Sequence, residues 1–373
     1  MFACYGIVLG TWTARIPAIK SGLQLGDGML GVALLGFAVG AITGMQWIGR
    51  PVDRYGGGRI MVVAAVADGV LLITPALAGN LAVLVGCLLA FGVAHGSLNI
   101  AMNAYAVQVE RAWGTSIMTS FHAVYSIGGF LGAALGGVAA QAGLAPGATF
   151  GIVTVLVGVL AGVAMRLLPA AAGAAAVLAP PERTRPGTAA SGVFFLGVLA
   201  FCCLVGEGAA ADWSSVYVRD RLGSGAGFAA AAYAAFAVMM TVGRLVGDRL
   251  ATRLGPVTLV RCSGLLAGVG LGTALLVDRP VAGVIGFGVF GAGLSCIAPL
   301  VFSAAGNRDP DRAGQAIARV ASLGWAGFLV GPIVIGGVAQ LIGLAAALAI
   351  PVLLALFVAS TAIALRPAGS VAR

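Results

Sequence analysis

The sequence predicts an all-α integral membrane protein with twelve transmembrane helices in two pseudo-symmetric bundles of six. Three observations support this class. The chain of 373 residues is 60% hydrophobic and only 9% charged, which is too little charge to cover the surface of a water-soluble domain. Its apolar stretches have the length of a bilayer crossing. A charged turn in the first half also recurs at an equivalent place in the second half.

Charge clusters, prolines and glycine turns divide the chain into apolar stretches of about 20 residues, the length that a helix needs to cross a bilayer. An Ala-, Pro- and Gly-rich segment with a charged centre separates two sets of six, as a linker would. The predicted domains are therefore 1–168, a cytoplasmic linker at 169–191, and 192–366. The expected spans are 2–18, 28–49, 60–79, 81–108, 116–141, 147–168, 192–213, 228–247, 256–277, 281–305, 313–341 and 343–365.

The first span is short for a crossing, because Arg15 follows soon after Met1 and no basic residue precedes the apolar run. We expect it to be the remainder of a longer helix whose first residues are missing.

The distribution of basic residues predicts the orientation. With the linker and both termini in the cytoplasm, fifteen of the 21 lysines and arginines lie inside, five lie outside, and Arg319 falls within a span. Basic residues concentrate in the cytoplasmic loops of membrane proteins. The prediction is a multi-pass protein of a cytoplasmic membrane with both termini inside, and the net charge of +9 requires no nucleic-acid partner.

Two landmarks indicate an internal repeat. Asp53-Arg54, within GRPVDRYGGGR at 49–59, matches Asp248-Arg249, within GRLVGDRLATRLG at 243–255. A row of glycines in the fifth span returns in the eleventh with the same spacing, and small residues of this kind let helices approach closely. Parallel repeats are a transporter architecture with the substrate site near the bilayer midplane. The predicted packing residues are Gly128, Gly132, Gly137, Gly327, Gly331, Pro332 and Gly336.

These segments resemble the signatures of the major facilitator superfamily. GRPVDRYGGGR is similar to the G-x-x-x-D-R-x-G-R/K-R/K loop motif, GRLVGDRL to its second-half counterpart, and GFLVGPIVIGG to the glycine–proline pattern of the eleventh helix. More narrowly, GTWTARIPAIK, AMNAYAVQVE, SFHAVYSIGGFLG and EGAAADWSSVYV resemble bacterial YbjJ-type members, which are distantly similar to sugar permeases. The resemblance implies a secondary transporter that works by alternating access.

The resemblance also implies that the charged loop is a latch, which holds the two halves closed on the cytoplasmic side. A carboxylate at Asp53 can accept hydrogen bonds from a helix N-terminus and can pair with an arginine. The alternative is a solvated turn whose charges only set topology. This chain departs from the motif because Gly57 and Gly58 replace the usual basic pair. The predicted gating residues are Gly49, Asp53, Arg54, Gly56, Arg59, Gly243, Arg244, Asp248 and Arg249.

Polar side chains inside the spans are costly in lipid and mark candidate transport sites. Every fourth residue from His95 to Asn103 is polar, so these residues share one face of a helix. Antiparallel packing around a turn near residue 112 would set Asn103 level with His122 and Asn99 level with Ser126. For Asp68 we expect a buried ion pair or a helix contact. The candidate substrate-binding residues are His95, Asn99, Asn103, His122, Tyr125, Ser126, Arg319 and Trp325.

Glu207 is the candidate proton-coupling residue, because it lies deep in the seventh span among small residues. Burial disfavours the charged form of a carboxyl, and a water-filled cavity or Arg319 would restore the charge. The alternative for Glu207 is a structural hydrogen bond to a neighbouring helix. Arg319 either meets an anionic group or extends to the cytoplasmic interface.

Other functions find less support. The six cysteines lie in apolar stretches and only two histidines occur, so neither a metal nor a cofactor is expected. GFGVFG at 286–291 lies inside an apolar span, which excludes a dinucleotide site. The sequence favours transport of a small polar solute, sugar-like or similar, with coupling to protons. The alternatives are a multidrug or metabolite efflux antiporter, and a non-transporting sensor or an intramembrane enzyme using His122 with Ser120 or Ser126. The expected partners are the solute, the lipid bilayer and protons, with the chain as a monomer.

Overall fold

The structure, a computed structural model, describes residues 1–25, 27–168 and 186–366, and within these ranges it is helical without a strand. Eleven of its helical segments are long and apolar enough to cross a membrane. The remaining expected span corresponds to α9 (Ala226–Leu254), whose 29 residues extend about 43 Å at 1.5 Å per residue. The prediction of an all-α membrane protein is confirmed.

The chain forms two compact units, and each is described separately. The first contains residues 1–113, 124–183 and 310–318, and the second contains 114–123, 184–309 and 319–373. The units therefore differ from the two predicted halves in two short segments, at the beginning of α5 (Met118–Gln141) and at the beginning of α13 (Ala313–Ile342). The predicted linker lies mostly outside the described residues, and its last residues belong to α8, which begins at Pro186.

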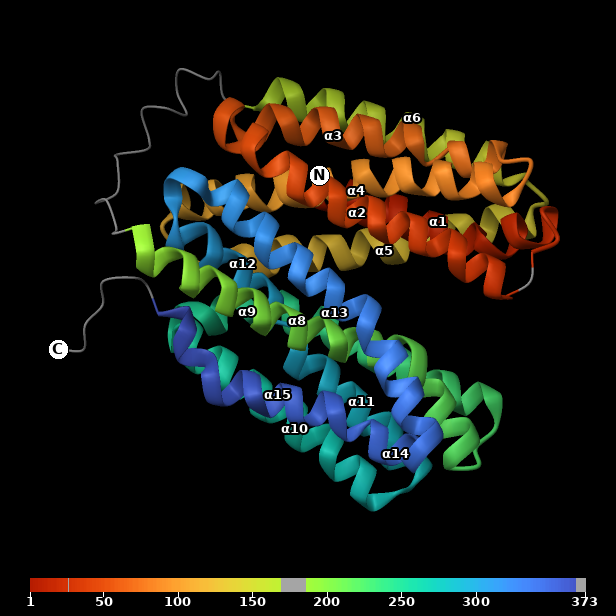
Figure 1. Cartoon of the computed structure of the whole chain (residues 1–373), viewed down its shortest axis with the longest axis vertical. Coiled ribbons are helices and arrows are strands. Elements are labelled where there is room, and N and C mark those ends of the chain that lie inside the picture. Colours follow the sequence, from red (N-terminus) through yellow and green to blue (C-terminus); the bar gives the residue numbers. More distant parts are fainter. Residues whose placement is uncertain (26, 169–185, 367–373) are drawn as a thin grey trace. The chain divides into compact units, whose positions relative to one another are not determined.

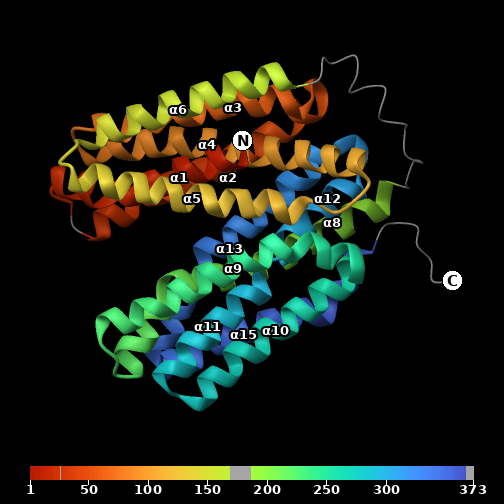
Figure 2. The ribbon, with the colours of Figure 1, turned by 180° about the vertical axis from the view of Figure 1, so that it is seen from behind.

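The first unit is a helical bundle in which α3 and α6 lie side by side (Figures 1 and 2). The first helix is longer than the sequence predicted, with 21 residues. A short 3-10 helix, η1, continues the third span. The elements are α1 (Phe2–Gly22), α2 (Asp27–Tyr55), α3 (Gly57–Leu71), η1 (Thr74–Leu77), α4 (Leu81–Trp113), α5 (Met118–Gln141) and α6 (Pro146–Leu167).

In the second unit, α10 and α15 lie side by side (Figures 1 and 2). A π-helical segment, η2, extends α8, and the 3-10 segment η3 precedes α13. The elements are α8 (Pro186–Val216), η2 (Tyr217–Arg221), α9 (Ala226–Leu254), α10 (Pro256–Val277), α11 (Pro280–Leu294), α12 (Ile297–Arg308), η3 (Pro310–Arg312), α13 (Ala313–Ile342), α14 (Leu344–Ala347), α15 (Ala349–Thr361) and η4 (Ala362–Leu365).

Two expected spans are each broken into two helices. The tenth span breaks at Ser295, four residues before Pro299, and the twelfth breaks after Ala347, four residues before Pro351. A proline ring clashes with the carbonyl of the residue four positions earlier and removes a backbone donor. The positions of both breaks follow from this local effect.

The two charged segments are helical rather than turns, which corrects the prediction for 49–59 and 243–255. Helix α2 runs to Tyr55 and α9 to Leu254, so one residue makes each connection. These residues are Gly56, with φ of 87°, and Gly255, with φ of 75°. A positive φ favours glycine because it has no Cβ.

Glycines bring neighbouring helices into backbone contact, as small residues do in membranes. A side chain at Gly40 of α2 would collide with the carbonyl oxygen of Leu89 on α4. A side chain at Gly132 of α5 would collide with that of Ile7 on α1. Large apolar side chains remain on the outside, including Phe130 at 76% exposure. This distribution suits a protein surrounded by lipid.

Candidate functional site

Asp53, in the last turn of α2, caps the N-terminus of α13. Its carboxylate accepts hydrogen bonds from the backbone N–H of Gly314 at 2.7 Å and of Gln315 at 3.2 Å. The side-chain amide of Gln315 donates a third bond at 3.1 Å. The first N–H groups of a helix have no partner within it and carry partial positive charge, so a carboxylate there is stabilising.

Asp248, near the end of α9, caps the N-terminus of α5 in the same manner. It accepts hydrogen bonds from the backbone N–H of Thr119 at 2.9 Å and of Ser120 at 2.8 Å. The Thr119 hydroxyl donates a further bond. Because α5 begins at Met118 and α13 at Ala313, each aspartate binds the second and third residues of its helix.

Among the remaining predicted gating residues, the two glycines pack against other helices, three arginines are exposed and one arginine is buried. Gly49 packs against α13, where an added Cβ would lie 3.1 Å from the Cα of Gln315. A side chain at Gly243 would collide with the hydroxyl of Ser295. The side chains of Arg54, Arg59 and Arg249 are exposed. Arg244 is buried inside α9.

A buried Asp–His pair lies inside the first unit. The carboxylate of Asp68 on α3 is 3.2 Å from Nδ1 of His95 on α4, and both side chains have 0% exposure. A buried charge is tolerated only when it is paired and hydrogen-bonded. The expectation of a buried ion pair or helix contact for Asp68 therefore has a specific partner here.

Three further contacts extend this pair into a polar cluster. The ring of Tyr5 on α1 stacks on His95, with ring centroids 3.8 Å apart. The side-chain amide of Asn99 donates to the Tyr5 hydroxyl at 3.1 Å, and that of Asn103 donates to the backbone carbonyl of Asn99 at 2.8 Å. Two buried atoms, His95 Nε2 and Asn99 Oδ1, have no hydrogen-bond partner among the described residues.

The candidate substrate-binding residues on α5 are divided between the two units. Tyr125 is in the first unit, with its ring 5.4 Å from that of Tyr5, and Ser126 is half-buried in the same unit. His122 belongs to the second unit, where it stacks on Phe302 at 5.8 Å. Sequence reasoning missed Tyr5 and linked His122 to Asn103 from helix register alone.

The second unit holds a buried cation beside Glu207. Arg244 on α9 is 3.7 Å from the Glu207 carboxylate on α8, and their side chains are 7% and 24% exposed. The thiol of Cys203, one turn before Glu207, lies 3.8 Å from the same carboxylate oxygen. The partner of Glu207 in the structure is thus Arg244, and not the Arg319 that the sequence suggested.

Arg319 and Trp325, two predicted substrate-binding residues, lie on α13. The side chain of Arg319 is exposed, as expected for an arginine that extends toward an interface. Trp325 is half-buried, with its ring 6.4 Å from that of Phe328.

The predicted glycine rows have unequal packing roles. Gly128 and Gly132 of α5 lie against α1, and a Cβ at either would collide with backbone oxygen. Gly137 departs from the prediction, since a Cβ there would meet no atom within 4 Å. On α13, Gly327, Gly331 and Gly336 contact Phe201, Val205 and Trp213 of α8. The side chain of Pro332 lies outside the described part of the structure.

Comparisons with known proteins agree with this architecture. Residues 1–318 match the family model of the Major Facilitator Superfamily. An MFS-type transporter of Yersinia pestis is 34% identical, over 97% of this chain and 93% of that protein. The membrane protein MosC of Rhizobium meliloti is 31% identical, over 93% of this chain and 84% of that protein.

Solved structures share the fold at low sequence identity. The transporter FucP in an outward conformation aligns with a TM-score of 0.76 and 16% identity, over 98% of this chain and 99% of that one. The proton:xylose symporter XylE aligns with a TM-score of 0.73 and 15% identity, over 96% and 93%.

Proposed function

Because the chain belongs to the major facilitator superfamily, it is a secondary transporter, and we propose that it carries a small polar, sugar-like solute by alternating access. The observation behind this proposal is the pair of buried atoms on α4, His95 Nε2 and Asn99 Oδ1, that no described residue satisfies. An unsatisfied buried polar group costs about 1–3 kcal/mol. A solute that donates hydrogen bonds to both atoms would remove that cost.

Asp68 determines what His95 offers to the solute. We propose that Asp68 is ionised and accepts the hydrogen bond from Nδ1 of His95, because an ionised carboxylate has no proton to donate. Nε2 of the neutral imidazole is then an acceptor. Asn99 likewise presents its oxygen, because its amide nitrogen donates to Tyr5. Two acceptors on one helix face favour a solute with two donors, such as the hydroxyls of a sugar-like ring.

Glu207 is proposed to couple transport to protons through Arg244. Protonation removes the charge that holds the two side chains together at 3.7 Å and frees the buried guanidinium for another partner. A ligand changes a conformational equilibrium only through different interactions with the two states. A proton on Glu207 would provide such a difference between the two states, because it changes the interaction between α8 and α9.

The caps at Asp53 and Asp248 are proposed as the latch on the cytoplasmic side. Each cap gives a carboxylate to a helix N-terminus through at least two hydrogen bonds. Breaking such a cap costs about 0.5–2 kcal/mol, which is enough to shift a conformational equilibrium without unfolding the protein. This proposal includes the cytoplasmic location of both termini, supported by the distribution of Lys and Arg, and a bacterial inner membrane.

A ligand screen tests the polar solute. The melting temperature of the purified full-length protein in detergent is measured in the presence of sugars, polyols, amino acids and apolar cationic drugs. A ligand that binds the folded state raises the melting temperature of the protein. We expect a polyhydroxylated solute to stabilise the parent and to lose its effect on Asn99→Leu. The matched variant Asn307→Leu removes an exposed amide and should keep the response. Stabilisation by apolar drugs alone would contradict the proposal and favour efflux.

A further inference from the structure

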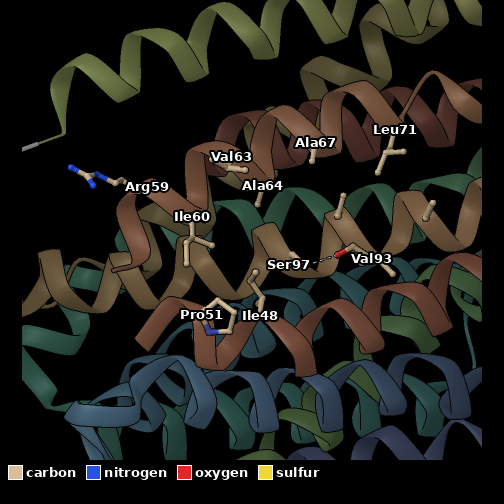
Figure 3. A pocket seen from close by; sticks show the side chains of 12 residues that line it. Ile48, Pro51, Arg59, Ile60, Val63, Ala64, Ala67, Leu71, Val93 and Ser97 are labelled. Atoms are coloured by element: carbon tan, nitrogen blue, oxygen red, sulfur yellow. Dashed lines mark hydrogen bonds between the residues drawn. The ribbon is translucent and has the colours of Figure 1, made fainter. Parts of the chain in front are cut away.

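An apolar groove runs along the outside of the first unit, between α2, α3 and α4. Its volume is about 470 Å³. Figure 3 shows Ile48 and Pro51 of α2 on one side, residues of α3 on the other, and Val93 and Ser97 of α4 between them. The lining residues are Ile48, Pro51, Arg59, Ile60, Val63, Ala64, Ala67, Leu71, Ala90, Val93, Ala94 and Ser97.

The lining suits a hydrocarbon chain. Four of its residues are alanines, which leave room between the helices, and the larger ones are aliphatic. The hydroxyl of Ser97 donates to the Val93 carbonyl at 2.7 Å, so its donor is already used within α4. A groove with so few polar groups favours an apolar occupant.

The length of the groove matches one leaflet of a bilayer. On α3 the lining runs from Arg59 to Leu71, which corresponds to about 18 Å at 1.5 Å per residue. Half of the hydrocarbon core of a bilayer is about 15 Å. An acyl chain that enters the groove beside Arg59 would therefore extend to the middle of the membrane.

The end of the groove beside Arg59 is positively charged. Arg54 is also exposed there, while the nearby acid, Asp53, is engaged by α13. The side chain of Trp47 is 82% exposed and that of Tyr55 is 65% exposed. Exposed tryptophan and tyrosine are typical of the membrane–water interface, and basic pockets between transmembrane helices bind anionic headgroups.

We propose that this groove is a binding site for an anionic phospholipid, with one acyl chain between α2, α3 and α4 and its headgroup phosphate at Arg59. The positive charge at the open end favours an anionic lipid over a zwitterionic one, and the apolar lining favours a lipid over a free phosphate. The site is independent of the solute and of proton coupling, so it stands or falls separately from the proposed function.

Native mass spectrometry of the purified full-length chain tests the site. Phosphatidylglycerol and phosphatidylcholine with identical acyl chains are titrated against the parent and three variants. We expect the parent to prefer phosphatidylglycerol and Arg59→Gln to lose about fivefold in affinity for it. Arg253→Gln removes an exposed charge at the end of α9, outside the groove, and should keep the preference.

Ala67→Phe tests the acyl chain separately from the charge, because Ala67 is a half-buried residue in the lining. We expect it to weaken the binding of both lipids while circular dichroism and gel filtration match the parent. Equal affinity of the parent and Arg59→Gln for phosphatidylglycerol, or equal binding of the two lipids by the parent, would overturn the proposal. Unchanged lipid binding by a folded Ala67→Phe variant would also overturn it.

Discussion

Among single side chains, Glu207 leads to the most direct test of coupling. Glu207→Gln resembles the protonated carboxyl and cannot form the ion pair with Arg244. We predict that it abolishes accumulation driven by a pH gradient but retains exchange of solute across vesicles, because exchange needs no net proton movement. The solute is the one identified by the ligand screen. Asp212→Asn, an exposed acid on the same helix, should behave as the parent. Accumulation by Glu207→Gln at the parent level would make the residue structural.

The Asp68–His95 pair predicts an asymmetric effect on stability. His95→Leu leaves the Asp68 carboxylate, which has 0% exposure, without its hydrogen-bond partner, and this costs about 1–3 kcal/mol, or more for a charged group. Asp68→Asn keeps the shape and a hydrogen-bonding group, so its melting temperature should fall less. Thermal unfolding in detergent compares the two variants. Equal losses would indicate that the pair contributes through packing and not through charge.

At the level of helices, the glycine row of α5 predicts changes of opposite sign. Gly132→Ala places a methyl group against the carbonyl oxygen of Ile7, and overpacking of this kind costs about 1–3 kcal/mol. Gly137→Ala meets no atom within 4 Å and should stabilise the helix by about 0.5–1 kcal/mol, since alanine loses less backbone entropy. Melting temperatures measure both. A stable Gly132→Ala variant would mean that α1 and α5 are not in this close contact.

Loss of either aspartate cap should affect only the start of the helix that it caps. Asp53→Asn should loosen the start of α13 and speed amide hydrogen exchange over Pro310–Ala318, whereas Asp248→Asn should do so at Met118–Ser120. Each variant is the control for the other, because each removes the same charge from a helix N-terminus. Loss of a charged cap is worth about 1 kcal/mol, or about fivefold in an equilibrium.

Transport distinguishes a latch from a simple cap. If the caps hold the closed cytoplasmic side, Asp53→Asn should reduce solute transport at normal expression, because the outward-facing state becomes less populated. Unchanged transport together with unchanged exchange at Pro310–Ala318 would exclude the latch.

For the whole molecule, the distribution of basic residues predicts orientation. Alkaline phosphatase fused after Gly223, between η2 and α9, should be active, and the same enzyme fused after Arg373 should be inactive. Green fluorescent protein should give the opposite pattern, because it folds in the cytoplasm. The physical reason is the retention of Lys- and Arg-rich loops on the inner side. Phosphatase activity at the C-terminus would reverse the predicted topology.

Two of the pairs that the sequence analysis missed were within reach of helix geometry. Glu207 lies 18 residues before Gly225 and Arg244 lies 19 after it, so antiparallel α8 and α9 bring them to one level. Asp68 and His95 are related in the same way around Leu81, at 13 and 14 residues. The level of a residue on adjacent helices can therefore be predicted, whereas the rotation of each helix about its axis cannot.

The sequence by itself determined the membrane class, most helix boundaries, and the equivalence of Asp53 and Asp248. These features depend on local composition and on interactions along one helix. Only the tertiary structure decided that Asp53 caps a helix 261 residues away, that Tyr5 stacks on His95, and that Gly137 has no close neighbour. Such contacts depend on which helix faces which and on the rotation of each helix about its own axis, and the sequence of one helix does not specify that rotation against its neighbour.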